Sequence, residues 1–297
     1  MSIAAIIVTY NRKDLLFENL KMLLKQTIPL DSVIIVDNAG TDGTREAVLA
    51  SELSKILNID YVYLNSNTGG AGGFSYGVEY AYKKGFDWLL LMDDDGKPFD
   101  ETCIEKLLEK GEYVKKNHCP QVMLNSVVTS DGMNLSFLPF TVSEFKEMAK
   151  STDGLFRHVI NPFNATLISK EAVAVVGYPR ADFFMSCDER EYNCRNEKMG
   201  TFCASVLDSI YVHPNARDVV VHIFKKKYEL FSNPNKEYYF MRNNIIIEGQ
   251  RLKFAVSQYL KRLYIVFRYE DNKMKRARLI TKATLDGVSG RMGKRVF

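Results

Sequence analysis

Four short apolar runs in the first third of the chain each stop abruptly on polar side chains, and this pattern constrains the fold most. The runs are IAAIIVTY (3–10), SVIIVDNAG (32–40), IDYVYLN (59–65) and FDWLLLMDDD (86–95). The first is continuous and β-branched, as in a strand buried on both faces of a parallel sheet, and the second repeats it. Segments with helical apolar spacing separate the runs. This alternation predicts a doubly wound, mostly parallel α/β sheet.

Helices are expected between these runs. One begins at residues 11–14 and continues through Leu24, a second covers 43–57, and a third extends from about Ala71 to Lys84. After Gly96 the alternation weakens, and residues 134–156 show no clear period, which is compatible with a mobile loop or lid. From about Glu237 the chain is helical, basic and aromatic.

The strand ends are the expected place for a ligand, because open α/β sheets bind ligands beyond the carboxyl ends of their strands. Polar or glycine-rich segments follow each predicted strand, at 9–11, 37–38, 65–73 and 93–95. One cleft is expected to collect them.

Asp93, Asp94 and Asp95 directly follow a buried run. Three adjacent carboxylates repel one another, and a hard divalent cation such as Mg²⁺ or Mn²⁺ would offset this repulsion. Such a cation keeps coordination positions open for phosphate oxygens. An acidic turn or a helix N-cap is the structural alternative, since aspartate suits both. The position after a strand favours the metal site.

Four glycines lie within five residues, at 69, 70, 72 and 73, ahead of a predicted helix. Glycines there let the backbone approach a ligand closely, and a helix N-terminus favours anions. The segment matches neither the GxGxxG dinucleotide pattern nor a P-loop ending in GK[ST]. It therefore argues against NAD binding and ATP hydrolysis. A flexible surface loop is the alternative.

The charge distribution is uneven. The net charge is +4, yet thirteen Lys and Arg residues stand against three acidic residues from Arg251 to the end. Such a segment can approach phosphates, anionic lipid or nucleic acid, or can simply be a solvated helix face. Residues 251–269 mix apolar and cationic side chains, which suits an anionic membrane surface. They suit equally well packing on the rest of the protein with the cations outward.

The sequence lacks three features whose absence indicates the cellular compartment. Five cysteines include no CxxC pair, which indicates free thiols in a reducing compartment. The N-terminal segment lacks a signal-peptide pattern, and no stretch approaches the roughly 20 apolar residues of a membrane span. We expect a cytoplasmic protein whose membrane contact, if any, is peripheral, on the inner face of the plasma membrane.

The motifs IIVTYNR, VIIVDNAGTDGT, NTGGAGGF and LLLMDDD, in this order, resemble family 2 glycosyltransferases of the GT-A fold. The similarity extends from Ile3 to about Asn244. The double-glycine loop resembles the galactofuranosyl- and rhamnosyltransferase branch more closely than the cellulose- and chitin-synthase branch. The resemblance implies a catalytic domain over 1–235, with a nucleotide-sugar half (1–96) and an acceptor and base half (97–235). A helical extension (236–297) follows.

The resemblance also implies a donor site. The first strand end and Asp37 would hold the nucleobase, and the aspartate triplet would hold the ribose, the diphosphate and Mn²⁺ or Mg²⁺. The outer carboxylates, Asp93 and Asp95, are the expected metal contacts. Arg242 is expected either at the diphosphate or as a helix cap. The residues expected to bind the nucleotide-sugar are Thr9, Tyr10, Asn11, Arg12, Asp37, Asn38, Asn67, Gly69, Gly70, Gly72, Gly73, Asp93, Asp94 and Arg242.

FFMSCDEREYNCR (183–195) resembles the family's FFxxxDDxEYxxR, in which the aspartate two residues before the glutamate is the catalytic base. Glu189 holds that position here, beside Asp188, and the choice between the two stays open. A carboxylate at a helix start can deprotonate an acceptor hydroxyl, or can merely complement the helix dipole. Glu191 is expected to face the acceptor.

Two histidines compete for a third metal position. In the resembling branch a metal-binding histidine precedes an aromatic segment that ends in Arg-Asn, here EYYFMRNN (237–244). This relation favours His222, with His213 as the competitor.

These features together favour an inverting, metal-dependent glycosyltransferase. It would transfer galactofuranose or rhamnose from a UDP- or dTDP-sugar to a glycan or lipid-linked oligosaccharide in bacterial polysaccharide synthesis. A sugar-phosphate nucleotidyltransferase would carry a glycine-rich signature beside the first strand, which VTYNRKDLL lacks. A non-catalytic sugar-binding module is disfavoured by the intact carboxylates. No nucleic-acid partner is expected, and the oligomeric state is left open.

Overall fold

The structure is a computed structural model that describes residues 1–136, 138–151, 153–214, 219–223 and 226–295. Its strands are β1 (Ile3–Thr9), β2 (Ser32–Asp37), β3 (Ile59–Tyr63), β4 (Trp88–Asp93), β5 (Lys97–Pro98), β6 (Val122–Thr129), β7 (Leu155–Phe156), β8 (Thr166–Ser169), β9 (Phe202–Val212), β10 (Val219–Ile223) and β11 (Lys226–Leu230).

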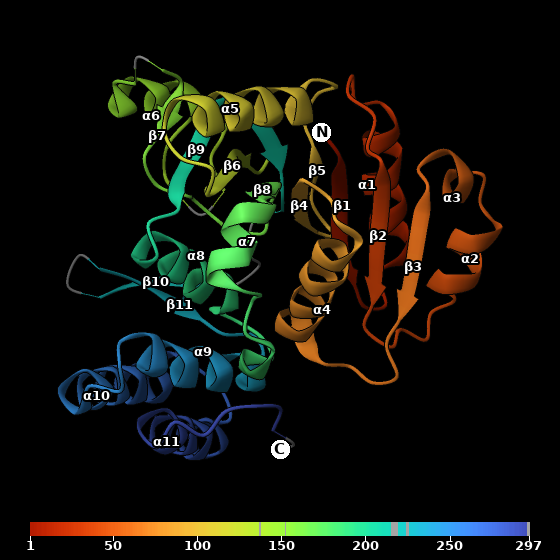
Figure 1. Ribbon diagram of the computed structural model, residues 1–297. Coiled ribbons are helices and arrows are strands. Elements are labelled where there is room, and N and C mark those ends of the chain that lie inside the picture. The colour runs from red at the N-terminus through yellow and green to blue at the C-terminus, as the bar shows by residue number, and fades with distance from the viewer. Residues whose placement is uncertain (137, 152, 215–218, 224–225, 296–297) are drawn as a thin grey trace.

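Helices follow or cover most of these strands (Figure 1). They are α1 (Lys13–Leu24), α2 (Thr44–Ala50), α3 (Leu53–Ile56), α4 (Gly69–Lys84), α5 (Cys103–Asn117), α6 (Val142–Ala149), α7 (Lys170–Val176), the 3₁₀ helix η1 (Ala181–Phe183), α8 (Asp188–Lys198), α9 (Pro234–Ile247), α10 (Leu252–Tyr269) and α11 (Lys273–Val288). None of the helices in the described part of the chain is long and apolar enough to span a bilayer.

The main sheet has the strand order β3-β2-β1-β4-β8-β6-β9-β5, with β7 also paired to β9. The parallel prediction is confirmed for its first half, because β1 pairs in parallel with β2 and β4, and β2 with β3. The second half is mixed, since β8 runs antiparallel to both β4 and β6.

Burial of β1 explains why helices must cover both faces of the sheet. Ile3, Ala5 and Ile7 belong to one core cluster, and Ala4 and Ile6 to another. The side chains alternate between faces, so every residue of this strand packs inward on one face or the other. With both faces closed, the carboxyl ends of the strands are left as an edge where a ligand can enter.

The glycine-rich segment opens α4, which begins two residues earlier than expected and packs tightly on β1. A Cβ on Gly73 would lie 2.4 Å from a methyl carbon of Val8, and one on Gly77 would lie 2.5 Å from a methyl carbon of Ile6. Both distances are shorter than van der Waals contact. These two glycines therefore set how closely the helix approaches the strand.

The expectation of an irregular segment over 134–156 is wrong for part of it. Residues Val142–Ala149 form α6, which begins with a capping box between Thr141 and Glu144. The helix is only two turns long, so its apolar spacing is too short to produce a clear period.

The three C-terminal helices lie together beneath α8 in Figure 1. Buried charges join them, because Glu237 of α9 accepts hydrogen bonds from Arg262 of α10 and from Arg276 of α11. Glu270 pairs with the same two arginines. Each of these four side chains is nearly or fully buried. The proposed division of the chain at residue 235 stays a prediction.

Gly73, which packs on β1, and Gly70, which faces open space, give a stability prediction. Gly73→Ala should lower the free energy of unfolding by about 1–3 kcal/mol, because the new methyl group has no room against Val8. Gly70→Ala should change it by less than about 1 kcal/mol, since no atom lies within 4 Å of a Cβ there. Urea unfolding of both variants measures the difference. Equal losses would contradict the packing role.

Candidate functional site

A cleft of about 1070 Å³ opens where β1 and β4 end, at the edge that the topology predicts. Side chains from both halves of the sheet contribute to it. Its lining residues are Arg12, Leu15, Gly70, Phe74, Asp93, Asp95, Asn161, Pro162, Phe163, Asn164, Met185, Ser186, Asp188, Glu189, Arg190, His213, Pro214 and Lys236.

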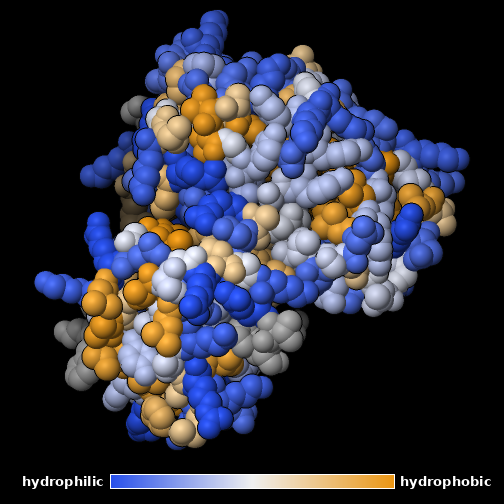
Figure 2. Space-filling view, turned by 60° about the horizontal axis from the view of Figure 1, so that its bottom comes forward, coloured by the Kyte–Doolittle hydropathy of each residue, from blue (hydrophilic) through white to orange (hydrophobic). Residues whose placement is uncertain are grey.

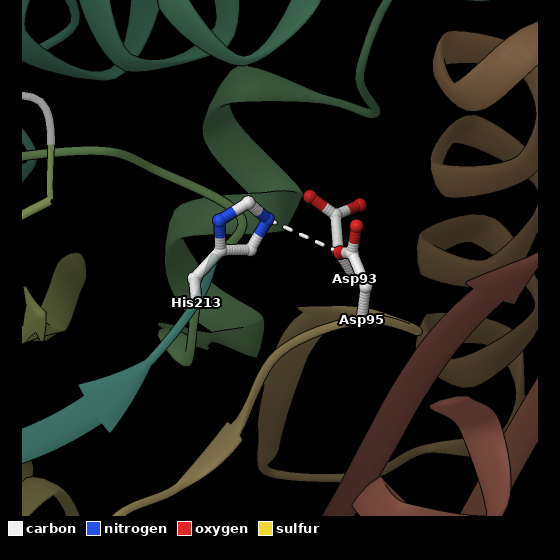
Figure 3. Close-up of side chains that lie close together, drawn as sticks. All are labelled: Asp93, Asp95 and His213. Atoms are coloured by element: carbon white, nitrogen blue, oxygen red, sulfur yellow. Dashed lines mark ion pairs between the residues drawn. The ribbon is translucent and has the colours of Figure 1, made fainter. Parts of the chain in front are cut away.

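Asp93, Asp95 and His213 face one another in this cleft (Figure 3). Each offers one ligand atom, and the three atoms lie within 4.8 Å of one another. Asp93 ends β4, Asp95 lies in the turn after it, and His213 directly follows β9. The Nε2 atom of His213 lies 3.1 Å from Oδ1 of Asp95.

The ring orientation of His213 fits a metal ligand. Its Nδ1 atom lies 2.8 Å from the carbonyl oxygen of Pro214. Because a carbonyl only accepts, Nδ1 carries a proton and Nε2 is directed at the aspartates. This is the arrangement in which an outer hydrogen bond orients a metal-binding imidazole.

The electrostatics of the cluster favour an added cation. Burial, and then the charge of Asp95, raise the pKa of Asp93 to about 7. Burial lowers the pKa of His213, but the hydrogen bond that His213 donates to Asp95 and the charge of Asp93 outweigh it, so the net shift is upward. A carboxylate that retains its proton near neutral pH, as Asp93 does here, is one whose charge the protein compensates incompletely.

Arg12 partly compensates the triplet. Its Nη1 donates to Oδ2 of Asp95 at 2.6 Å and to Oδ1 of Asp94 at 3.1 Å. Asp94 is buried and also accepts from the hydroxyl of Thr9 at 2.8 Å. Asp94 therefore joins the end of β4 to the end of β1, and Asp93 and Asp95 line the cleft.

Asp37 and Asn38 are buried and are engaged within the protein. Asp37 accepts from the hydroxyl of Tyr61 and from the amide of Gly40. Asn38 donates to the carbonyl of Gly69 at 2.7 Å and accepts from the amide of Thr68. These contacts fix the two loops beside the cleft, and a nucleobase contact by either residue stays a prediction.

Three further residues that the sequence predicts to bind the nucleotide-sugar lie around the same loops. Tyr10 is exposed. Asn11 has a left-handed backbone and accepts from the amide of Thr41 at 2.6 Å. Asn67 accepts from the amide of Gly69 at 2.8 Å. Their contacts with a nucleotide also stay predictions.

Most of the predicted loop glycines have a packing role. Gly69 has a φ of +75°, and a Cβ there would lie 1.8 Å from the carbonyl oxygen of Phe184. A Cβ on Gly72 would lie 2.4 Å from the side chain of Thr68. Gly70 is the member of the group that lines the cleft with open space before it.

Asp188 and Glu189 form the first turn of α8 and line the cleft together. Asp188 is nearly buried, and its burial, followed by the charge of Glu189 and a hydrogen bond with it, raise its pKa well above the ordinary value. The protonated form of Asp188 is therefore favoured. Which member of the pair accepts a proton from the cleft stays a prediction.

Backbone strain concentrates beside this pair. Ser186 and Cys187 have φ values of 64° and 66°, and Asn161 and Phe163 across the cleft have 54° and 68°. Residues other than glycine rarely adopt this conformation, which costs on the order of 1–3 kcal/mol each. Such outliers cluster at functional sites.

Glu191 does not line the cleft. Its carboxylate pairs with Nε and Nη2 of Arg195 at 2.9 and 3.0 Å, one turn along α8. Its neighbour Arg190 lines the cleft instead, and also lines an adjoining cavity of about 240 Å³. Neighbours on a helix point about 100° apart, so knowing the phase of α8 would have identified Arg190.

Arg242 is fully buried and is absent from the cleft lining. Its guanidinium donates to the carbonyls of Gly293 and Phe183 at 2.7 and 2.8 Å. Asn243, which sequence reasoning missed, donates to the carbonyls of Met185 and Ser186. The Arg-Asn pair therefore holds the loop before α8, and a diphosphate contact by Arg242 stays a prediction.

His222, the predicted third metal ligand, belongs to β10, and its side chain lies outside the described part of the structure. Its role stays a prediction. The histidine that the structure brings to Asp93 and Asp95 is the competitor, His213. The clue available in the sequence was its position at the end of a strand, like that of the aspartates.

Comparison with known proteins identifies the family. The family model described as glycosyl transferase family 2 matches residues 4–173. Galactofuranosyltransferase GlfT1 of Mycolicibacterium smegmatis is 30% identical over 225 residues, which cover 73% of this chain and 72% of the relative. The dTDP-rhamnosyl transferase RfbF of Shigella flexneri is 23% identical over 307 residues, covering 98% of this chain and 97% of the relative.

Solved structures share the fold at lower identity. S. aureus TarS 1–349 in complex with UDP-GlcNAc has a TM-score of 0.58 and 17% identity, covering 97% of this chain and 82% of that one. Mannosyltransferase PcManGT from Pyrobaculum calidifontis, in complex with GDP-Man and Mn²⁺, has a TM-score of 0.57 and 15% identity, covering 99% and 76%. The predicted GT-A fold is thus confirmed. The chain belongs to glycosyl transferase family 2 and is a glycosyltransferase, similar to the galactofuranosyl- and rhamnosyltransferase branch.

Proposed function

We propose that this glycosyltransferase moves galactofuranose or rhamnose from a UDP- or dTDP-linked donor to a glycan acceptor, with inversion, in bacterial polysaccharide synthesis. The observation that carries the proposal is that one cleft holds both the Asp93–Asp95–His213 cluster and the Asp188–Glu189 pair. The names of the relatives support these two sugars. Those names give no support to the nucleotidyltransferase or the non-catalytic alternative.

The donor half of the cleft fits a divalent cation. Two carboxylates suit Mg²⁺ or Mn²⁺, and the oriented imidazole completes a set of three ligands with room for the donor's diphosphate. When bound, the cation would stabilise the negative charge that develops on the leaving nucleoside diphosphate. Arg12, already held between Asp94 and Asp95, is the protein's own cation on this side of the cleft.

The side of the cleft that holds Asp188 and Glu189 would remove the proton of the acceptor hydroxyl. Glu189 would take the proton of the acceptor hydroxyl while Asp188 retains its own. The acceptor oxygen then forms a bond to the anomeric carbon as the bond from that carbon to the diphosphate oxygen breaks. One displacement of this kind inverts the configuration and needs no covalent enzyme intermediate.

Arg190 belongs to the acceptor side in this scheme. It directly follows Asp188 and Glu189 in sequence, and Asn244 and Glu248 of the α9 region accept hydrogen bonds from its guanidinium. A glycan or lipid-linked oligosaccharide would enter past it. The predicted acceptor contact of Glu191 is less favoured, because that carboxylate is engaged by Arg195.

Metal binding should depend on His213 and not on His222. Titration calorimetry of UDP and dTDP, each with Mn²⁺ and with EDTA, should show metal-dependent binding of one nucleotide. Asp93→Ala/Asp95→Ala should abolish it, and His213→Ala should weaken Mn²⁺ binding by about tenfold or more. His222→Ala is the matched control and should leave it within about twofold. The opposite order of the two histidine variants would restore the original assignment of His222.

The raised pKa of Asp93 gives a pH prediction. A metal binds the deprotonated carboxylate, and that form is lost as the pH falls through about 7. Protonation of His213, whose pKa is also raised, acts in the same direction. Mn²⁺ should therefore bind about tenfold more weakly at pH 6 than at pH 8. An affinity that is constant over this range, measured by calorimetry, would contradict the placement of Asp93 in the metal site.

Substitution of the two base candidates should separate their roles. Glu189→Gln should lower kcat by a factor of about 10²–10⁴ without changing nucleotide binding. Asp188→Asn should cost less, because the amide still donates a hydrogen bond to Glu189. Release of nucleoside diphosphate from the donor in the presence of acceptor measures kcat. A larger loss for Asp188→Asn than for Glu189→Gln would assign the base to Asp188.

A further inference from the structure

One face of α10 is uncovered although it is apolar. Ala255, Ile265 and Val266 point into the core and are almost fully buried. On the opposite side, five large apolar side chains are between 46% and 64% exposed. They are Leu252, Val256, Leu260, Tyr264 and Phe267. Their spacing of three or four residues places them in a single row, here called the α10 stripe.

Apolar residues gather on the surface of the C-terminal helices, to which α10 belongs (Figure 2). Figure 2 shows a run of hydrophobic residues at the lower left, over the C-terminal helices, with hydrophilic residues beside it. Contiguous exposed apolar surface of this kind marks a site of contact with a protein or a membrane.

The charges along α10 indicate which of these partners fits. The 18 residues of the helix include no aspartate or glutamate. Lys253, Lys261 and Arg268 are exposed alongside the stripe, and Arg251 is exposed at its N-cap. A second copy of this helix would bring cations against cations. An anionic bilayer supplies an apolar interior for the stripe and phosphates for the cations.

The location of α10 relates this face to the active site. Phe254 and Gln258 of α10 line the 240 Å³ cavity, together with Phe240 of α9 and Arg190. Arg190 also lines the catalytic cleft. A surface that holds α10 is therefore one helix away from the side of the cleft where the acceptor would enter.

We propose that α10 docks the enzyme on an anionic bilayer, with the α10 stripe among the acyl chains and its cations at the headgroups. Docked in this way, the Arg190 side of the cleft lies close to the membrane. The docking follows from α10 itself, and the identity of that side as the acceptor side rests on the proposed function.

Vesicle binding of the full chain tests the docking. The probes are vesicles of phosphatidylcholine alone and vesicles with about 30% phosphatidylglycerol, with co-sedimentation as the readout. The wild type should bind the anionic vesicles at least about tenfold more tightly than the neutral ones. Leu260→Glu/Phe267→Glu should reduce anionic binding at least about tenfold, since it puts two charges into the stripe.

The matched control is Leu49→Glu/Ile56→Glu. It makes the same two changes at exposed apolar positions on α2 and α3, at the opposite edge of the sheet. It should bind vesicles like the wild type. Equal binding by the two double variants, or no binding of the wild type to anionic vesicles, would overturn the docking. Self-association that Leu260→Glu/Phe267→Glu abolishes, without vesicle binding, would assign the stripe to a second copy.

Nucleotide binding measured on the same samples keeps the two proposals separate. All variants should bind UDP or dTDP like the wild type, because none of the four substituted residues lines the cleft. Loss of vesicle binding with normal nucleotide binding concerns docking alone. Vesicle binding without any nucleotide binding would leave docking intact and would count against the proposed donor site.

Discussion

The burial of like charges at the end of β4 is the constraint on which the rest of the site depends. Asp93 and Asp95 are half-buried at the cleft and repel each other, and their repulsion must be compensated. Two side chains compensate part of this charge: Arg12, which follows β1, and His213, which follows β9. Both follow strands whose carboxyl ends lie at the same edge of the sheet as the end of β4, so the fold itself brings the compensating groups together. A divalent cation would complete the compensation, and a donor diphosphate would then have a counter-charge in place.

The sequence was sufficient to predict the first half of the sheet and the position of the aspartates at its edge, because both depend on local pattern. Buried parallel strands produce continuous apolar runs, and topology then places their polar ends in one cleft. The prediction was weaker where a role depends on packing between distant segments. Gly73 was expected at a ligand, and in the structure it packs on Val8. Arg242 was expected at the diphosphate or as a helix cap, and in the structure it donates to backbone carbonyls. No local pattern distinguishes those uses of a glycine or an arginine.

The second half of the site shows the same limit more clearly. Asp188 and Glu189 were identified from a motif. The structure was required to find the phase of α8, which directs Arg190 and not Glu191 into the cleft. The loop before α8 has a strained backbone, and Asn243 of α9 holds it with hydrogen bonds to its carbonyls. The C-terminal helices therefore have two roles in this account. Their buried face supports the loop that carries the base, and the exposed face of α10 offers a surface for a membrane.

The most direct test of the central claim is where a metal ion binds when the donor nucleotide is present. Crystals of the protein grown with Mn²⁺ and UDP or dTDP, measured at a wavelength where manganese scatters anomalously, would locate the ion without assumptions about its ligands. The account predicts one strong peak within coordination distance of Asp93, Asp95 and His213, with the diphosphate on its open side. Nucleotide bound in the cleft with manganese elsewhere, or with no manganese, would contradict it.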